Sequence, residues 1–176
     1  MKITTRQLAM DAMLAAMCAV LGYLAIDTGT VKITFESLPI LLGAVLFGTV
    51  DGLLIGGIGT GIYQLLRYGV SATTVLWMIP YMLCGFLVGL YAKKKSFSLT
   101  RNETVFIVVV NELLITVLNS LVLLADSKIY GYYFPGLITG ALALRLVICV
   151  VKAVVFGLVL PMLVNGVSKV IDAKRA

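Results

Sequence analysis

Long runs of apolar residues, separated by short polar stretches, make up most of this chain of 176 residues. The runs are continuous rather than alternating, which favours helices over half-buried β-strands. Several approach the roughly 20 residues with which a helix crosses a bilayer, where every backbone group must be hydrogen-bonded within the protein. We therefore expect six membrane-spanning helices, at residues 7–26, 38–49, 51–68, 73–92, 103–125 and 138–167.

The second and third of these helices are short, and the sequence FGTVDG joins them. Gly48 and Gly52 flank the three residues in between, and glycine is among the strongest signals for a turn. We expect two helices here rather than one long helix.

Lysine and arginine residues between the runs predict the orientation, because cytoplasmic connections carry more of them. Six spans place nine of these residues on one side and three on the other: Lys2, Arg6, Lys93, Lys94, Lys95, Arg101, Lys169, Lys174 and Arg175 against Lys32, Arg67 and Lys128. Both termini are therefore expected in the cytoplasm. The outward connections are then residues 27–37, 68–72 and 126–137.

Composition points to the same class, since 61% of the residues are hydrophobic and only 12% are charged. Soluble domains are closer to half apolar and a quarter charged. We expect one integral-membrane domain over residues 1–176, an all-α bundle whose net charge of +6 reflects orientation in the bilayer and not binding to nucleic acid.

The sequence lacks the residues that several kinds of catalytic and metal-binding sites usually require. It has no histidine, no Walker A loop and three cysteines that all fall inside apolar runs. These features argue against a transition-metal site, a Ser-His-Asp arrangement, a disulfide and ATP hydrolysis on this chain. We expect no cofactor and no enzymatic activity.

Small residues form stripes on the first helix. Ala9, Ala12, Ala16 and Ala19 share one face, and Ala15 with Ala19 gives a second small pair four residues apart. Small residues let two helices approach closely in lipid. The stripe is compatible with packing inside the chain or with docking to a separate membrane subunit. Gly52, Gly56, Gly57 and Gly61 in the third helix, with Gly85 and Gly89 in the fourth, are expected to pack within the bundle.

Ionisable residues inside two of the runs are functional candidates, because a charge at the membrane centre costs at least about 2.5–3.5 kcal/mol on insertion scales. The fifth helix carries a polar stripe of Glu112, Thr116, Asn119 and Ser120. The sixth carries Arg145 and Lys152, which share one face and lie roughly 10 Å apart along the axis. One interpretation is an internal ion pair with Glu112. The other is that one cation is left over for an anionic ligand from outside, because Glu112 can neutralise only one.

Aromatic residues gather near the expected outer ends, where an interfacial belt alone would explain many of them. Trp77 and Tyr81 are one turn apart on the fourth helix, and Gln64 and Arg67 lie at the outer end of the third. Together these four side chains are candidates to stack on and hydrogen-bond a flat heterocycle.

One segment carries a family resemblance. The sequence ITFESLPILLGAVLFGTVDGLLIG at residues 33–56 resembles the substrate-binding S components of energy-coupling factor (ECF) vitamin transporters. The matching positions are Phe35, Leu38, Pro39, Gly43, Leu46, Phe47, Gly48 and Gly52, with Thr49 where proline is common. The closest likeness is to the folate-type subfamily, which has an Arg followed by a Lys in its last helix.

The resemblance implies a bacterial multi-pass membrane subunit that binds a vitamin, folate or a related pterin in the first place. It also implies a transmembrane coupling subunit, contacted by the face of Ala12, Ala16, Ala15 and Ala19, and two cytoplasmic ATPases as partners. Arg145, Lys152, Glu112, Asn119, Gln64, Arg67, Trp77 and Tyr81 become candidate ligand-binding residues. The connection at 27–37, with Lys32, Phe35 and Glu36, becomes a candidate lid.

Other functions stay open at this point. Pantothenate, a hydroxymethylpyrimidine, a pyridoxine-like compound or a queuosine precursor would also suit a small polar pocket. Two functions from other classes are a proton-coupled carrier that uses Glu112 and a membrane scaffold whose charges only pair internally.

Overall fold

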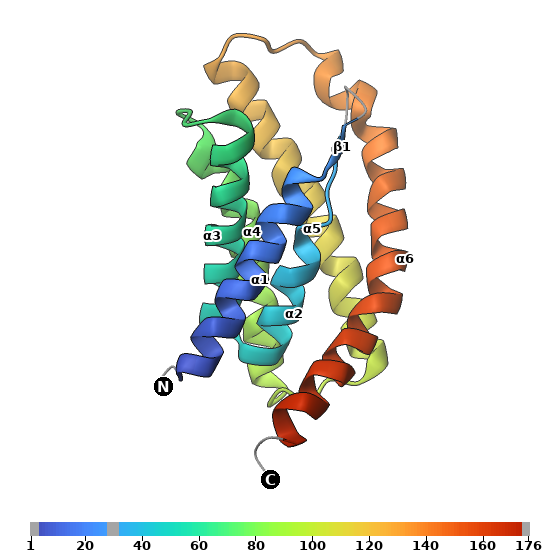
Figure 1. Cartoon of the computed structure of the whole chain (residues 1–176). Coiled ribbons are helices and arrows are strands. Elements are labelled where there is room, and N and C mark those ends of the chain that lie inside the picture. Colours follow the sequence, from blue (N-terminus) through green and yellow to red (C-terminus); the bar gives the residue numbers. More distant parts are fainter. Residues whose placement is uncertain (1–3, 28–31, 174–176) are drawn as a thin grey trace.

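The computed structural model describes residues 4–27 and 32–173, and these residues form a bundle of helices with one short hairpin (Figure 1). The elements in chain order are α1 (Thr5–Tyr23), β1 (Ile26–Asp27), β2 (Lys32–Ile33), α2 (Ser37–Phe47), α3 (Thr49–Tyr68), α4 (Thr74–Lys94), α5 (Arg101–Ile129) and α6 (Gly136–Ala173). β1 pairs antiparallel with β2, with Ile26 opposite Ile33. The six expected helices are all present, and the hairpin was not predicted.

Three of the described helices are long and apolar enough to cross a membrane, namely α4, α5 and α6. The apolar helix α2 has only 11 residues. α1 and α3 are not among these three candidate spans. The length and composition of the helices thus support a membrane protein, and the six spans stay a prediction.

The predicted turn between α2 and α3 is confirmed. Gly48 ends α2 with a φ of 108°, a left-handed conformation that favours glycine. Because the chain reverses there, α2 packs beside α3 and α4 and buries most of its side chains, including Ile40, Leu41 and Ala44. α2 therefore lies at the centre of the core.

The expected packing of the glycine pairs inside the bundle is also confirmed. A Cβ atom added at Gly52 of α3 would lie 2.5 Å from the carbonyl oxygen of Gly85 on α4. One added at Gly89 would lie 2.5 Å from the backbone of Gly48 and Thr49. The two helices touch backbone to backbone, and no larger residue fits between them.

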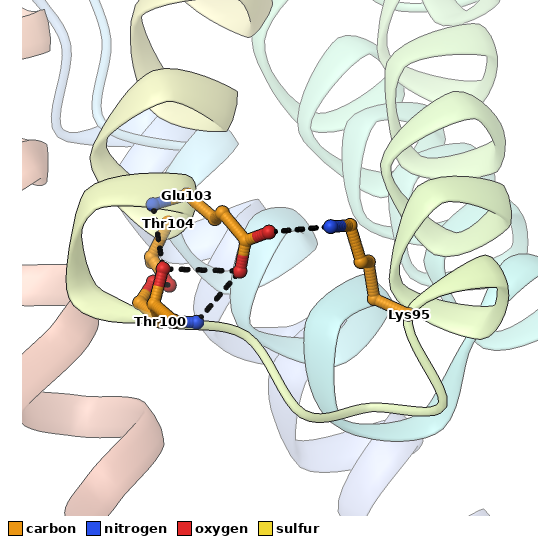
Figure 2. A network of polar contacts seen from close by, with 4 residues as sticks. All are labelled: Lys95, Thr100, Glu103 and Thr104. Carbon is orange, nitrogen blue, oxygen red and sulfur yellow. Dashed lines mark hydrogen bonds and ion pairs between the residues drawn. The ribbon is translucent and has the colours of Figure 1, made fainter.

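One end of the bundle carries the first turn of α1, the last turns of α6 and the α4–α5 connection (Figure 1). At this end Thr100 and Glu103 form a capping box that starts α5, and Lys95 reaches Glu103 with a 2.6 Å ion pair (Figure 2). The hydrogen bond and charge of Glu103 raise the pKa of Lys95. The opposite end carries the hairpin, the α3–α4 connection and the α5–α6 connection (Figure 1).

Candidate ligand-binding site

A cavity of about 580 Å³ lies at the end that carries the hairpin. Its walls come from β2, the start of α2, and α3 to α6, with the following lining residues: Lys32, Thr34, Glu36, Tyr63, Gln64, Tyr68, Ser71, Thr73, Trp77, Tyr81, Ile115, Thr116, Asn119, Leu123, Asp126, Tyr130, Tyr132, Leu137, Arg145, Ile148 and Lys152. This volume is in the range of small-molecule sites, and the mixture of apolar walls with a few polar groups is typical of them.

A buried ion pair closes the deep end of the cavity. Lys152 Nζ lies 2.8 Å from Glu112 Oε2, and the two side chains are 8% and 1% exposed. Ser37 Oγ donates a 2.7 Å hydrogen bond to Glu112 Oε1, so α2 joins α5 and α6 here. Glu112 therefore takes Lys152, and the internal pair that the sequence left open is present.

Arg145 is the second cavity-lining cation of α6, and Glu112 does not pair with it. Its Nη1 donates a 2.9 Å hydrogen bond to Ser120 Oγ, and its buried Nε has no hydrogen-bond partner. Within the described residues, no carboxylate forms an ion pair with its guanidinium. Arg145 lines the cavity roughly 10 Å further out along α6 than Lys152.

Glu36 lies in a different place from the one that the sequence predicts. The sequence predicts a lid residue, but the side chain is 1% exposed and lines the cavity at the start of α2. The hydroxyls of Tyr81 and Thr34 hydrogen-bond its carboxylate, and its Oε2 atom has no partner. Its position at the N-terminus of α2 is favourable for a negative charge.

The other two residues of the expected lid, Phe35 and Lys32, lie in different parts of the structure. Phe35 packs its ring edge-on against Phe156, with 6.1 Å between the centroids, and belongs to the core rather than to a cover. Lys32 lines the cavity with its Nζ 4.1 Å from the centre of the Tyr68 ring. The part of this connection at residues 28–31 lies outside the described residues.

Most of the predicted aromatic and amide residues meet in the cavity. Gln64, Trp77, Tyr81 and Asn119 all line it, and Asn119 Nδ2 donates a 3.2 Å hydrogen bond to the Tyr81 hydroxyl. Arg67 is the exception. Its Nη1 donates to the backbone oxygen of Tyr23 at the end of α1, and the residue is not part of the lining.

Sequence reasoning missed the acid at the outer rim. Asp126 is 9% exposed and accepts hydrogen bonds from Trp77 Nε1, at 3.3 Å, and from the Tyr132 hydroxyl. Burial and the bond to Asp126 raise the pKa of Tyr132 to about 12. Asp126 falls just after the predicted span at 103–125, so the sequence indicates only a connection residue there.

The alanine residues of α1 face two directions. Ala9, Ala12 and Ala16 are exposed together with Met13 and Met17. Ala15 and Ala19 are only 4% and 5% exposed, and a Cβ atom at Gly59 of α3 would lie 2.9 Å from the Ala15 oxygen. These two are buried within the bundle, Ala15 against α3, so the exposed part of the predicted stripe is Ala9, Ala12 and Ala16.

No group of three or more His, Cys, Asp or Glu side chains that could hold a metal ion occurs in the described part of the chain. The cavity groups are hydrogen-bond donors and acceptors suited to an organic ligand.

Comparison with known families agrees with a ligand-binding role. Residues 6–164, most of the chain, match the family model described as "ECF transporter, substrate-specific component". No curated protein matches the chain.

Proposed function

The chain belongs to the family of ECF transporter substrate-specific components, and on that basis we propose that its cavity binds the transported vitamin, folate or a related pterin in the first place. Membership makes the protein a membrane-bound, substrate-binding transporter subunit and not an enzyme. The identity of the ligand is argued from the groups that line the cavity.

One observation carries this proposal. Glu36 Oε2 and Arg145 Nε are both buried, both belong to residues that line the cavity, and neither has a hydrogen-bond partner. A buried polar atom without a partner costs about 1–3 kcal/mol, and more when it is charged. A ligand that donates hydrogen bonds at one end and carries negative charge at the other would be complementary to the carboxylate of Glu36 and the guanidinium of Arg145.

A folate has this polarity. The amino group and the neighbouring ring N–H of its pterin form a two-donor edge, which suits a carboxylate such as Glu36. Its glutamate tail is an anion, which suits the guanidinium of Arg145. Trp77 and Tyr81 supply aromatic surface for the flat ring between the two ends.

The remaining features of the proposal follow from orientation. The end with the first turn of α1 and the Lys93–Lys95 cluster faces the cytoplasm, so the cavity opens outward from a bundle of six spans in a bacterial cell membrane. The exposed face of Ala12 and Ala16 contacts the transmembrane coupling subunit, which joins it to two cytoplasmic ATPases. The hairpin with Lys32 covers the ligand.

A hydroxymethylpyrimidine is the second candidate ligand. Its aminopyrimidine edge suits Glu36, but it has no anionic tail for Arg145. Pantothenate has the anionic end but no such edge. A proton-coupled carrier acting through Glu112 is disfavoured, because Lys152 and Ser37 already hold that carboxylate.

Binding of a vitamin panel to the purified protein, measured by calorimetry, tests the proposal. Folate is expected to bind, and Glu36→Gln and Arg145→Ala are each expected to weaken it by about 1.5–3 kcal/mol, roughly 10- to 150-fold in Kd. 6-Hydroxymethylpterin, which keeps the pterin edge but has no carboxylate, should be insensitive to Arg145→Ala but sensitive to Glu36→Gln.

The matched control is Lys128→Ala. It removes one positive charge at the same end of the bundle from a side chain that stacks on Tyr133 and does not line the cavity. Its Kd for folate should equal that of the wild type. Binding of hydroxymethylpyrimidine instead of folate would select the second ligand, and a panel without any binding would refute the assignment of the cavity.

A further inference from the structure

Two acidic side chains face each other between α1 and α3, away from the ligand cavity. Asp11 is 8% exposed and Asp51 is 3% exposed. Neither lines the cavity. Asp11 precedes Gly22, at the cavity end of α1, by eleven residues, which is roughly 16 Å along the helix. The pair is therefore a separate polar site near the end that carries the termini.

Two of the carboxyl oxygens of this pair have no hydrogen-bond donor within the described residues. The side chains of Asp11 and Asp51 are in hydrogen-bonding contact with each other, and Gln7 Nε2 donates to Asp51 Oδ1 at 2.7 Å. Asp11 Oδ1 and Asp51 Oδ2 have no partner, although both atoms are buried. Each helix thus contributes one buried carboxyl oxygen that accepts no hydrogen bond.

No cation in the described residues balances these two acids. α2, which also packs on α1, has no ionisable side chain between Ser37 and Phe47. Arg6 on α1 and Lys93 and Lys94 at the end of α4 are exposed, and no ion pair joins any of them to either acid. Two adjacent carboxylates in a buried site strongly disfavour double ionisation.

We propose that Asp11 and Asp51 hold one proton between them and that this proton fastens α1 to α3. The proton supplies the missing hydrogen between the two side chains and removes one of the two negative charges. A carboxylic acid that donates to a carboxylate forms a charge-assisted hydrogen bond, which is stronger than one between neutral groups. Gln7 then stabilises the remaining charge on Asp51.

The position of the pair suggests what the proton controls. Asp11 directly precedes Ala12 in the exposed alanine face of α1. Loss of the proton would leave two negative charges facing each other across the α1–α3 contact and push the helices apart. The exposed face would then move relative to the rest of the bundle. This last step rests on the proposed docking of a coupling subunit, whereas the shared proton does not.

Infrared difference spectroscopy of the full-length protein in lipid nanodiscs tests for the proton directly. A C=O band of a protonated carboxyl is expected at neutral pH, and it should be absent in Asp11→Asn and in Asp51→Asn. Glu36→Gln removes another buried carboxyl, on a different element, and should keep this band. Absence of the band in the wild type, or its survival in both Asn variants, would overturn the proposal.

The stability of the protein provides a second readout. The folded pair keeps a proton that the unfolded chain releases above the ordinary range of aspartate, so the unfolding constant should rise with pH by up to tenfold per unit. Asp11→Asn cannot release this proton and should flatten that dependence. If stability instead follows Na⁺ when sodium chloride replaces choline chloride, with no effect of pH, a cation and not a proton occupies the site. Neither measurement uses a vitamin or a coupling subunit, so failure here leaves the proposed ligand site untouched.

Discussion

Removal of the Glu112 charge is expected to be among the most damaging single substitutions in the bundle. In Glu112→Gln the ammonium of Lys152, now 2.8 Å from a carboxylate and 8% exposed, loses its counter-charge in a buried site. Breaking a buried ion pair from one side costs about 3–5 kcal/mol, because the remaining charge is neither solvated nor paired. Gln still accepts from Ser37, so the loss is mainly electrostatic.

Removal of both charges should restore most of that stability. Lys152→Met keeps the length of the side chain but leaves Glu112 with only Ser37 as a partner. The double variant Glu112→Gln, Lys152→Met removes both members of the pair, and replacement of a buried pair by uncharged residues is often neutral or even stabilising. We expect the double variant to unfold within about 1 kcal/mol of the wild type. The loss of unfolding free energy in the double variant would then be several kcal/mol smaller than the sum of the losses in the two single variants.

Equilibrium unfolding in SDS from mixed micelles measures these free energies, with the fluorescence of Trp77, the single tryptophan, as the signal. Lys95→Ala is the control, because its ion pair with Glu103 is exposed and such pairs contribute little. Single variants that each cost under about 1 kcal/mol, with a double variant equal to their sum, would show that Glu112 and Lys152 do not act as a buried pair.

Two further predictions concern backbone packing and helix initiation. Gly52→Ala would place a methyl group 2.5 Å from the Gly85 oxygen and should destabilise the protein by about 1–3 kcal/mol. In Gly140→Ala the added methyl group has no neighbouring atom within 4 Å, so this variant should be slightly more stable than the wild type in the same unfolding assay. Equal effects of the two would contradict the close α3–α4 contact. Thr100→Ala removes the cap of α5 and should cost about 0.5–2 kcal/mol, clearly more than Lys95→Ala in the same capping network; the reverse order would contradict the role of the cap.

The helices could be predicted because each is a local consequence of apolar sequence. A continuous apolar run has no other way to satisfy its backbone in lipid, and Gly48 marks the turn between α2 and α3 by its own conformational freedom. β1 and β2 have two residues each, too few for a period to be visible. Their pairing depends on the distance between α1 and α2, which the sequence does not state.

The site was only partly predictable, because its contacts join different helices. The spacing of Arg145 and Lys152 correctly places both on the cavity side of α6. Which of them meets Glu112 depends on how α5 and α6 are rotated and shifted, and no local pattern reports that. Glu36 reads as a loop residue, and only the path of the chain into α2 buries it.

The alanine stripe illustrates the same limit on one helix. Ala15 and Ala16 are neighbours, and the 100° turn between adjacent helical positions places one against α3 and the other on the outside. Spacing identifies a face with small residues but not what covers it. The same holds for Arg67, whose position near the cavity end is right but whose side chain turns to the end of α1.

The pairing of Lys152 also constrains how the proposed ligand lies. Since Glu112 neutralises Lys152 at the deep end, an anionic group placed there would have to compete with an existing 2.8 Å ion pair and with the nearby carboxylate of Glu36. Arg145, roughly two helical turns further out, offers a positive charge that forms no ion pair with a carboxylate of the described residues. A ligand with one donor-rich and one anionic end should therefore enter with its donor edge first and keep its negative charge nearer the opening. Lys152, one of the two cations that the sequence offers to an anionic ligand, instead joins α5 and α6.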